Sequence, residues 1–261
     1  MELLVCIKQV PDDSVTVTLD ANGAPKLDDI APVVNAFDTY ALEMAARFKE
    51  ANGGSVTVLT IGGEGVVPSL RSCLAVGADH ACMLTDAAES DTQGTAHLLA
   101  KASKKAGEQP FDVIFCGSES TDAASAQVGV QLAEELGLPV ITNVLALEPK
   151  DGGISAKQET EEGYRIVEAP CPCVVTIVKP DYEPRYPSIK SKMAARKMPI
   201  GSLTAADVEA DASKFGPDAA KVRRVSISAP AQRQGGVKIQ EKEAAVAVSR
   251  AIEMMAGQKL I

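Results

Sequence analysis

Short apolar runs alternate with helix-like segments through the first 145 residues or so of this chain. The runs are rich in β-branched residues, and segments such as 35–51 repeat apolar residues at helical spacing. Strands that alternate with helices form a mostly parallel sheet with both faces covered. We therefore predict an α/β fold with a doubly wound, mostly parallel sheet. The expected strands are residues 2–10, 55–63, 80–86, 111–117 and 139–148, and the expected helices are 35–51, 66–78, 91–107 and 125–137.

Local signals refine this pattern at three places. Asn22-Gly23 lies between alternating residues and predicts a β-hairpin within residues 16–27. Asp91 or Thr92 is a suitable N-cap for the third helix. Residues 153–178 are expected to supply further strands, some of them antiparallel.

Three predicted strands end in segments that we expect to meet. In an open parallel sheet, ligands bind beyond the carboxyl ends of the strands. A ligand crevice is therefore predicted where the following segments converge: Cys6-Ile7-Lys8, Thr60-Ile61-Gly62 and Cys116-Gly117-Ser118.

The loop within Val113–Gly137 contains no Lys, Arg or His, although it leads from a strand directly into a predicted helix. Free N–H groups at Ser125–Val128 and the helix dipole could bind a phosphate without a basic side chain. Gly117 would allow close backbone approach, and Asp122 could accept from a ribose or cap the helix. An ordinary capped strand–helix turn would have the same sequence pattern, so it remains an alternative. The chain has neither a Walker motif nor a GxGxxG motif. The loop also carries the hydroxyl groups of Ser118, Ser120, Thr121 and Ser125.

Composition excludes several classes of function. The 261 residues carry a net charge of −9, which argues against binding to nucleic acids or to membrane surfaces. Aromatic residues make up 3% and Trp is absent, so a stacking platform for single strands is not expected. No apolar run approaches the ~18 residues of a membrane span, and the N-terminus does not resemble a signal peptide.

Six scattered cysteines and two histidines do not form a metal-binding pattern. Cys171-Pro-Cys173 is the one close pair, and its spacing differs from that of a Cys-x-x-Cys redox motif. We read it as the start of an apolar strand. The chain is therefore predicted to be a reduced, cytoplasmic protein without a metal site.

Residues 182–200 form a basic segment in this acidic chain. Prolines hold its start extended, and a short helix is expected after them. A solvated basic loop is one interpretation. The other is a docking loop in which an exposed apolar anchor is surrounded by cations that steer an acidic partner. The residues proposed to bind such a partner are Arg185, Ile189, Lys190 and Met193.

The strand–helix alternation is lost after about Gly201. A polar stretch, an extended stretch and an amphipathic helix follow, and about 60 residues could only marginally support a core of their own. We therefore divide the chain into an α/β nucleotide-binding domain, residues 1–200 with the docking loop, and a C-terminal arm, residues 201–261.

The chain resembles the beta subunits of the electron-transfer flavoproteins over nearly its whole length. Four stretches carry the resemblance. They are "VCIKQVPDD", "VVNAFDTYALEMAARFKE", "LRSCLAVGADHACML", and "EEGYRIVEAPCPCVVTI" with "EPRYPSIKSKMAARK".

This resemblance implies a heterodimer with a larger alpha subunit, whose FAD shuttles electrons, and a nucleotide bound in the crevice of the beta subunit. It implies that the arm wraps the alpha subunit and that Ile189 anchors an acyl-CoA dehydrogenase or a related flavoprotein. It assigns no catalytic residue. The residues that match the family's cofactor site are Cys6, Asn35, Ile61, Gly62, Gly117, Ser118, Asp122, Ser125, Ala126, Gln127 and Val128.

The nucleotide implied by the resemblance is either FAD or AMP. Ordinary members bind AMP as a structural ligand, whereas bifurcating members bind a second FAD that NADH reduces. Asp91, Thr92 and Thr95 resemble the bifurcating branch and favour FAD. Departures from the common pattern, such as Glu119-Ser120 and Ala36, keep AMP open. NADH oxidation is implied only for a bifurcating member in complex with its alpha subunit.

A different function class remains as an alternative. A stand-alone nucleotide or stress-sensing module on a similar sheet would form a homodimer and bind ATP. The basic docking loop at residues 182–200 argues against it.

Overall fold

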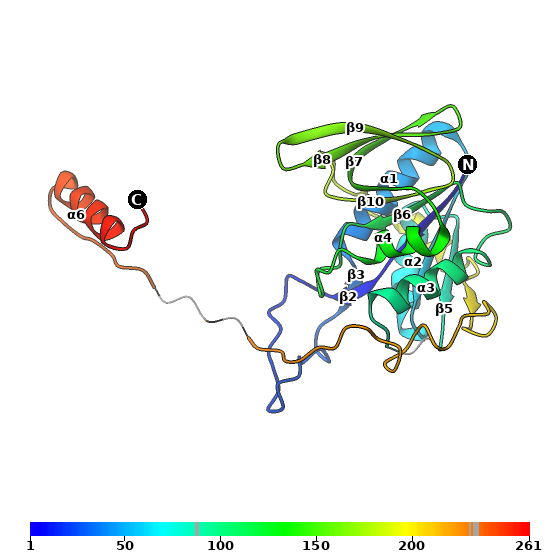
Figure 1. Cartoon of the computed structure of the whole chain (residues 1–261), viewed down its shortest axis with the longest axis horizontal. Helices are drawn as coiled ribbons and strands as arrows, with labels where there is room; N and C mark the ends of the chain where they lie inside the picture. Colours follow the sequence, from blue (N-terminus) through cyan, green and yellow to red (C-terminus); the bar gives the residue numbers. More distant parts are fainter. Residues whose placement is uncertain (87–88, 230, 232–234) are drawn as a thin grey trace. The chain divides into compact units, whose positions relative to one another are not determined.

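The structure is a computed structural model that describes residues 1–86, 89–229, 231 and 235–261. Within these residues, nine strands form one sheet in the order β11-β5-β4-β1-β6-β10-β7-β8-β9. Figure 1 shows β7, β8 and β9 next to one another in this sheet. The strands from β11 to β7 are parallel, and β8 and β9 extend the sheet by antiparallel pairing. The predicted α/β fold is confirmed. The strands are β1 (Glu2–Cys6), β4 (Ser55–Ile61), β5 (His80–Leu84), β6 (Val113–Gly117), β7 (Val140–Lys150), β8 (Gly153–Thr160), β9 (Gly163–Pro170), β10 (Cys173–Ile177) and β11 (Gly201–Leu203).

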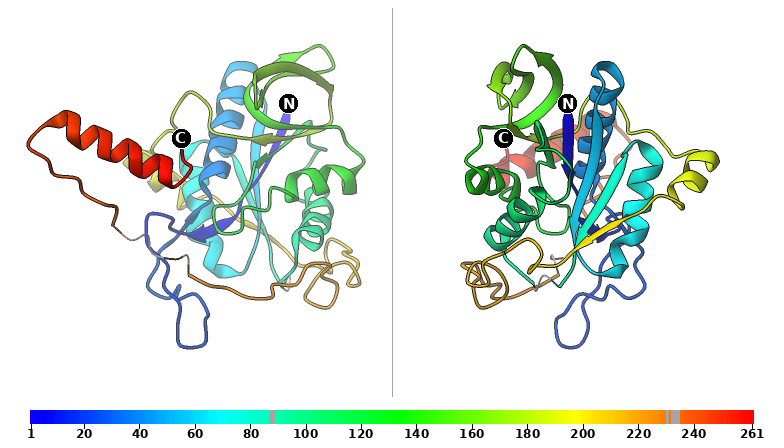
Figure 2. Two further views of the ribbon diagram at one scale, coloured as in Figure 1. Left: turned by 60° about the vertical axis from the view of Figure 1, so that its left-hand side comes forward. Right: turned by 90° about the vertical axis from the view of Figure 1, so that its right-hand side faces the viewer.

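Four helices cover the two faces of this sheet. Helices α1 and α2 pack on the face that carries Val5 and Phe115, and α3 and α4 pack on the face that carries Leu4 and Ile114. The right-hand view of Figure 2 shows these two layers on opposite sides of the sheet. Successive strand residues point to opposite faces of the sheet, and because helices cover both faces, residues 3–6 of β1 are all apolar and buried. The helices are α1 (Ala36–Asn52), α2 (Val67–Val76), α3 (Thr92–Ser103) and α4 (Val128–Leu136).

The winding of the chain reverses at β1, the middle strand of the seven that are parallel. From β1 the chain passes through α1 to β4 on one side, and it later passes from β5 through α3 to β6 on the other side. Val5 accordingly pairs with Val58 of β4 and with Phe115 of β6. At such a switch point the connecting loops leave in opposite directions and open a crevice beyond the carboxyl ends of the strands.

The ends of the helices follow local signals in the sequence. Asp91 is the N-cap of α3, and its Oδ1 accepts the N–H of Gly94 at 3.0 Å. Pro68 lies in the first turn of α2, where its missing N–H has no cost. Gly53, at φ 77°, follows α1, where glycine adopts a positive φ without steric cost.

The predicted turn around Asn22-Gly23 is present, and the N–H of Lys26 donates to the carbonyl of Thr18 at 2.8 Å, but the flanking residues form no extended strands. Residues 20–24 form a tight turn closed by the N–H of Asp20 and the carbonyl of Ala24 at 2.8 Å, but residues 16–27 of the described chain hold no extended strand. Val17 is exposed, and a two-stranded hairpin without a buried face is marginal in water.

Two small elements connect the first strand to α1. Strand β2 (Gln9–Pro11) pairs antiparallel with β3 (Pro32–Val34), apart from the main sheet. The single strand predicted for residues 2–10 is therefore divided, and Ile7 and Lys8 form a corner between its two parts.

The predicted boundary after residue 200 needs correction. Strand β11 pairs in parallel with β5, so the sheet continues beyond that boundary. The compact unit that holds the sheet contains residues 1–18 and 25–225, and residues 19–24 and 226–261 form a second unit. In the second unit, α6 (Ala244–Gly257) has no buried residue among those described. The C-terminal part of the second unit therefore begins at Ser226, and its role as an arm stays a prediction.

The described chain also contains two shorter helical segments. A 3-10 turn, η1 (Glu64–Val66), precedes α2, and α5 (Ile189–Ala195) lies in the basic segment. No helix in the described ranges has both the length and the apolar character needed to cross a membrane.

Candidate functional site

The three predicted strand ends do lie together. Strands β4, β1 and β6 are adjacent and parallel, so their carboxyl ends share one edge of the sheet. The reversal of winding at β1 lies within this group. The edge at which the sequence predicted a crevice is thus formed by three adjacent parallel strands.

Asn35 ties the loop after β6 to the start of α1. The residue is 1% exposed, and its Nδ2 donates to the carbonyl of Glu119 at 2.8 Å. Its Oδ1 accepts the N–H of Thr121 at 3.0 Å, and its own N–H donates to the carbonyl of Lys8 at 2.9 Å. The side chain therefore makes main-chain hydrogen bonds to two residues of the loop and so limits the conformations that the loop can adopt.

Asp38, which the sequence analysis did not select, lies under the same loop and is 5% exposed. Its two carboxylate oxygens accept the N–H of Lys8 at 2.6 Å and the N–H of Gly117 at 3.1 Å. Burial raises the pKa of Asp38 to about 7, although these hydrogen bonds act in the opposite direction. A Cβ atom at residue 117 would overlap Asp38 Oδ1 and lie 2.8 Å from the Cβ of Phe37, so this position requires glycine.

Lys8 brings a positive charge to a loop that has none of its own. Its Nζ lies 2.7 and 2.8 Å from the two carboxylate oxygens of Asp122 and 3.4 Å from the hydroxyl of Ser120. Burial raises the pKa of Asp122, but the hydrogen bonds from Lys8 and Ser120 outweigh it, so the pKa lies below its ordinary value. Asp122 is therefore paired with a lysine and does not cap α4.

The start of α4 differs from the prediction. The helix begins at Val128, three residues after the expected start at Ser125. The physical reason is Ala126, whose φ of 53° is left-handed and incompatible with a helix, while Gln127 returns to the right-handed region. Successive left- and right-handed residues direct neighbouring N–H groups into an anion-binding concavity. Within the described residues, the N–H groups of Ser125–Val128 donate no hydrogen bond.

The other predicted residues of the crevice lie at the same edge of the sheet. Cys6 and Cys116 are buried on neighbouring strands, and the hydrogen bond with Cys6, together with burial, keeps the pKa of Cys116 well above its ordinary value. Ile61 ends β4, and a Cβ at Gly62 would lie 2.5 Å from Val66. Ser118 follows β6, and its N–H donates to the carbonyl of Ile177 at 2.9 Å.

The predicted residues Asp91, Thr92 and Thr95 lie in and around the first turn of α3, which begins at the same edge. The second carboxylate oxygen of Asp91 accepts the N–H groups of Lys221 at 2.6 Å and of Val222 at 3.3 Å. Asp91 therefore also holds the segment that follows β11.

Lys8 and Asp38 are the two residues of this site that reasoning from the sequence missed. Lys8 was noted only as part of a strand end, and the polar loop was considered without it. The signal for Asp38 was an acid on the apolar side of a predicted helix, close to the residues that match the family.

Comparison with known proteins agrees with this geometry. The family described as "Electron transfer flavoprotein domain" matches residues 28–208, more than half of the chain. The chain belongs to the electron transfer flavoprotein family.

Several relatives in this family are similar over most of their length. The electron transfer flavoprotein subunit beta of Megasphaera elsdenii is 38% identical, with 100% of both chains covered. That of Thermoanaerobacterium thermosaccharolyticum is 39% identical over 90% of this chain and 91% of its own. The caffeyl-CoA reductase-Etf complex subunit CarD of Acetobacterium woodii is 34% identical over 92% of both. The resemblance to the beta subunits of the family is confirmed.

In this electron transfer flavoprotein chain, the basic segment exposes the apolar residues that were predicted to be exposed. Ser188 caps α5, and the side chains of Ile189 and Met193 are 82% and 61% exposed. Lys190 is exposed beside them. Arg185 pairs with Glu43 and Glu50 of α1, and its contact with a partner stays a prediction.

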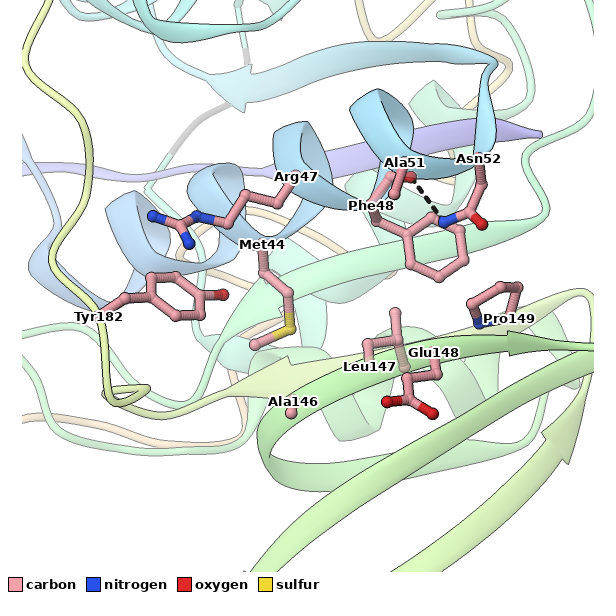
Figure 3. A pocket seen from close by; sticks show the side chains of 10 residues that line it. All are labelled: Met44, Arg47, Phe48, Ala51, Asn52, Ala146, Leu147, Glu148, Pro149 and Tyr182. Carbon is pink, nitrogen blue, oxygen red and sulfur yellow. Dashed lines mark hydrogen bonds between the residues drawn. The ribbon is translucent and has the colours of Figure 1, made fainter.

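A separate pocket lies between the C-terminal half of α1 and β7, with a volume of about 290 Å³ (Figure 3). Met44, Phe48 and Leu147 supply apolar walls, and Arg47 lies 4.0 Å from the ring centre of Tyr182. None of the residues predicted to bind a cofactor lines this pocket. Within the described chain, no group of three or more His, Cys, Asp or Glu residues could hold a metal ion.

Proposed function

We propose that this chain is the beta subunit of a heterodimeric electron-transfer flavoprotein and binds a nucleotide in the crevice between β1 and β6. The observation that carries the proposal is the backbone around Gly117 and Ser125–Val128. Glycine is required where the loop meets Asp38, and free N–H groups follow at the left-handed Ala126. These groups suit a phosphate, which accepts hydrogen bonds from main-chain donors.

We propose FAD as that nucleotide. Helices α3 and α4 pack side by side on one face of the sheet, and both begin at the carboxyl edge of the strands. A dinucleotide such as FAD can reach the starts of both helices, whereas the single phosphate group of AMP needs only one helix start. Relatives named for a caffeyl-CoA reductase complex and for an acryloyl-CoA reductase, at 34% and 32% identity, also favour the bifurcating branch.

AMP is the alternative ligand. The loop 117–128 alone would suffice for a single phosphate, and relatives named only as beta subunits are at least as similar as the reductase subunits. AMP would then be a structural ligand in a chain that carries no redox group itself.

In this proposal the chain positions groups and takes no part in covalent chemistry. Asn35 holds the loop, the N–H groups of Ser125–Val128 meet the phosphates, and Lys8 neutralises the carboxylate of Asp122 in the same loop. A bound FAD would supply the electron chemistry, with NADH as donor, and the protein would supply position and electrostatics. Electrons would pass to the FAD of the alpha subunit and then to an acyl-CoA dehydrogenase or a related flavoprotein docked at α5.

The test is a cofactor count on the complex purified with its alpha subunit. FAD and AMP are released by acid and quantified per heterodimer beside the visible spectrum. Two FAD and no AMP support the proposal, and NADH–dye activity should then appear in the complex. One FAD with one AMP would establish the alternative. A homodimer that binds ATP and no alpha subunit would establish a sensor module and overturn both.

A further inference from the structure

Glu43 of α1 is a buried carboxylate that holds the start of the basic segment. Its side chain is 2% exposed. Oε2 accepts from Nε of Arg185 at 2.8 Å and from the N–H of the same residue at 3.1 Å. Oε1 accepts from NH2 of Arg185 at 3.2 Å and from Nε of Arg47 at 2.5 Å. One acid therefore fixes both the main chain and the side chain of Arg185.

The hydrogen bonds to Glu43 together affect its pKa more than its burial does. Burial raises the pKa of a carboxyl group, but Arg185 and Arg47 lower the pKa of Glu43 below its ordinary value. Arg185 also pairs with Glu50. Glu50 lies on the surface of α1, one helical turn after Arg47. A buried charge that loses its partners is strongly unfavourable, so Arg185 has little freedom to leave this site.

A second arginine holds the other end of the segment. NH1 of Arg71 on α2 donates to the carbonyl of Ala195 at 2.6 Å and also to the carbonyl of Met198. Ala195 is buried in the core beside α2. These two carbonyls belong to the last turn of α5 and the residues after it, which have no partner within the helix.

The helix between these two attachments could not hold its shape alone. Helix α5 has seven residues, fewer than an isolated helix needs in water. It nevertheless presents Ile189 and Met193 outward from a defined backbone. A surface ordered before binding avoids the entropy loss of ordering on contact, and that saving appears as affinity.

We propose that Glu43 and Arg71 are positioning residues of the docking surface on α5: they clamp residues 185–198 at both ends, so that Ile189 and Met193 meet the partner in a preformed arrangement. This inference rests on the proposed function, because it presupposes that α5 docks the partner flavoprotein. It adds that the affinity of docking is set partly by residues that the partner does not touch.

The test is a double-mutant cycle in the heterodimeric complex, with Glu43→Gln and Ile189→Ala alone and together. The measured quantities are the Kd for a partner acyl-CoA dehydrogenase and the KM and kcat of its reduction. Glu43→Gln should raise Kd and KM about five- to ten-fold and leave kcat at saturating partner unchanged. In the Ile189→Ala background the same change should raise Kd less than two-fold, because the anchor it positions is gone.

Asp79→Asn is the matched control. Asp79 also binds a lysine and a main-chain N–H, at Lys49 and Val56, but it bonds to no residue of the segment 182–200. It should lower the melting temperature without changing Kd. Where Glu43→Gln does not give a soluble complex, Arg71→Gln takes its place in the same cycle.

The outcomes separate the inference from the function on which it rests. The clamp alone would be overturned if Glu43→Gln raised Kd by the same factor with Ile189 present and with Ile189→Ala. It would also be overturned if Glu43→Gln lowered the melting temperature and left Kd unchanged. An unchanged Kd in Ile189→Ala would overturn docking at α5 and the clamp with it. A non-additive cycle with normal nucleotide content supports both.

Discussion

The amide nitrogen of Gly117 lies 3.1 Å from Oδ1 of Asp38, so β6 and α1 meet with a backbone group against a buried carboxylate. Gly117→Ala would push a methyl group into that oxygen and toward Phe37. Overpacking of this kind costs about 1–3 kcal/mol. We expect a lower free energy of unfolding, measured with urea, and less nucleotide bound in the purified complex.

Gly63→Ala is the control for that experiment. A Cβ at residue 63 would meet no heavy atom within 4 Å, and the φ of −79° suits alanine. It should leave both quantities unchanged. Nucleotide content and stability equal to wild type in Gly117→Ala would show that the loop can move away from Asp38.

Ala126 allows a test of the main-chain donors. Proline fixes φ near −65° and has no N–H, whereas residue 126 needs a φ of 53°. Ala126→Pro should therefore lose the nucleotide of this subunit while the flavin of the alpha subunit stays bound. Ala126→Gly keeps the donor and relieves the left-handed strain, so it should retain the nucleotide. Full nucleotide occupancy in the proline variant would remove Ser125–Val128 from the proposed site.

The pH dependence of stability should report Asp38. Burial raises its pKa from 3.8 to about 7, so the stabilising contribution of the protonated form is complete below 3.8 and is lost as pH rises through about 7. Between pH 5.5 and 8 this loss amounts to about 2 kcal/mol. Because asparagine does not titrate, the free energy of unfolding of Asp38→Asn should fall by about 2 kcal/mol less than that of wild type over the same pH interval. Urea unfolding measures this difference.

Asp12→Asn is the matched control. Hydrogen bonds from Ser14 lower the pKa of Asp12, so it is ionised across this interval and should leave the pH dependence as in wild type. Equal slopes in wild type and Asp38→Asn would contradict the assignment of the titration to Asp38.

The exposed anchor can be tested alone. Full burial of an isoleucine contributes roughly 1.5–3 kcal/mol, so Ile189→Ala should weaken dehydrogenase docking by about ten-fold or somewhat more. Lys190→Ala should act mainly on the association rate and its salt dependence. Ile166→Ala, at another exposed isoleucine on β9, is the control and should not change docking. Nucleotide content should be normal in all three variants.

The C-terminal unit gives the last prediction. No residue of α6 is buried in the described chain, and the compact unit with the sheet ends at Val225. A chain truncated after Val225 should keep a cooperative thermal transition and lose affinity for the alpha subunit, measured by co-purification. Undiminished pairing would show that the segment 226–261 is not the arm. A cooperative melt of residues 226–261 expressed alone would also contradict it.

Local patterns in the sequence determined most of the fold and the outline of the site. Apolar runs such as that of β1 and helical stripes such as that of α1 depend on residues close in the chain, and they predicted the parallel sheet and its crevice. Asn35 and the exposed Ile189 were also found from the sequence, because each belongs to a stretch that resembles the family, and Gly117 was found because it ends an apolar run before the polar loop.

Only the tertiary structure decided which distant residues meet. Lys8 reaches Asp122 across 114 positions, Arg185 reaches Glu43 across 142, and β11 extends the sheet beside β5 from a stretch without a strand pattern. The start of α4 also shifted, because the left-handed Ala126 follows a loop held by Asn35. The sequence gives the charge of each side chain but not its ion-pair partner, because the partner depends on the topology that brings strand ends to one edge of the sheet.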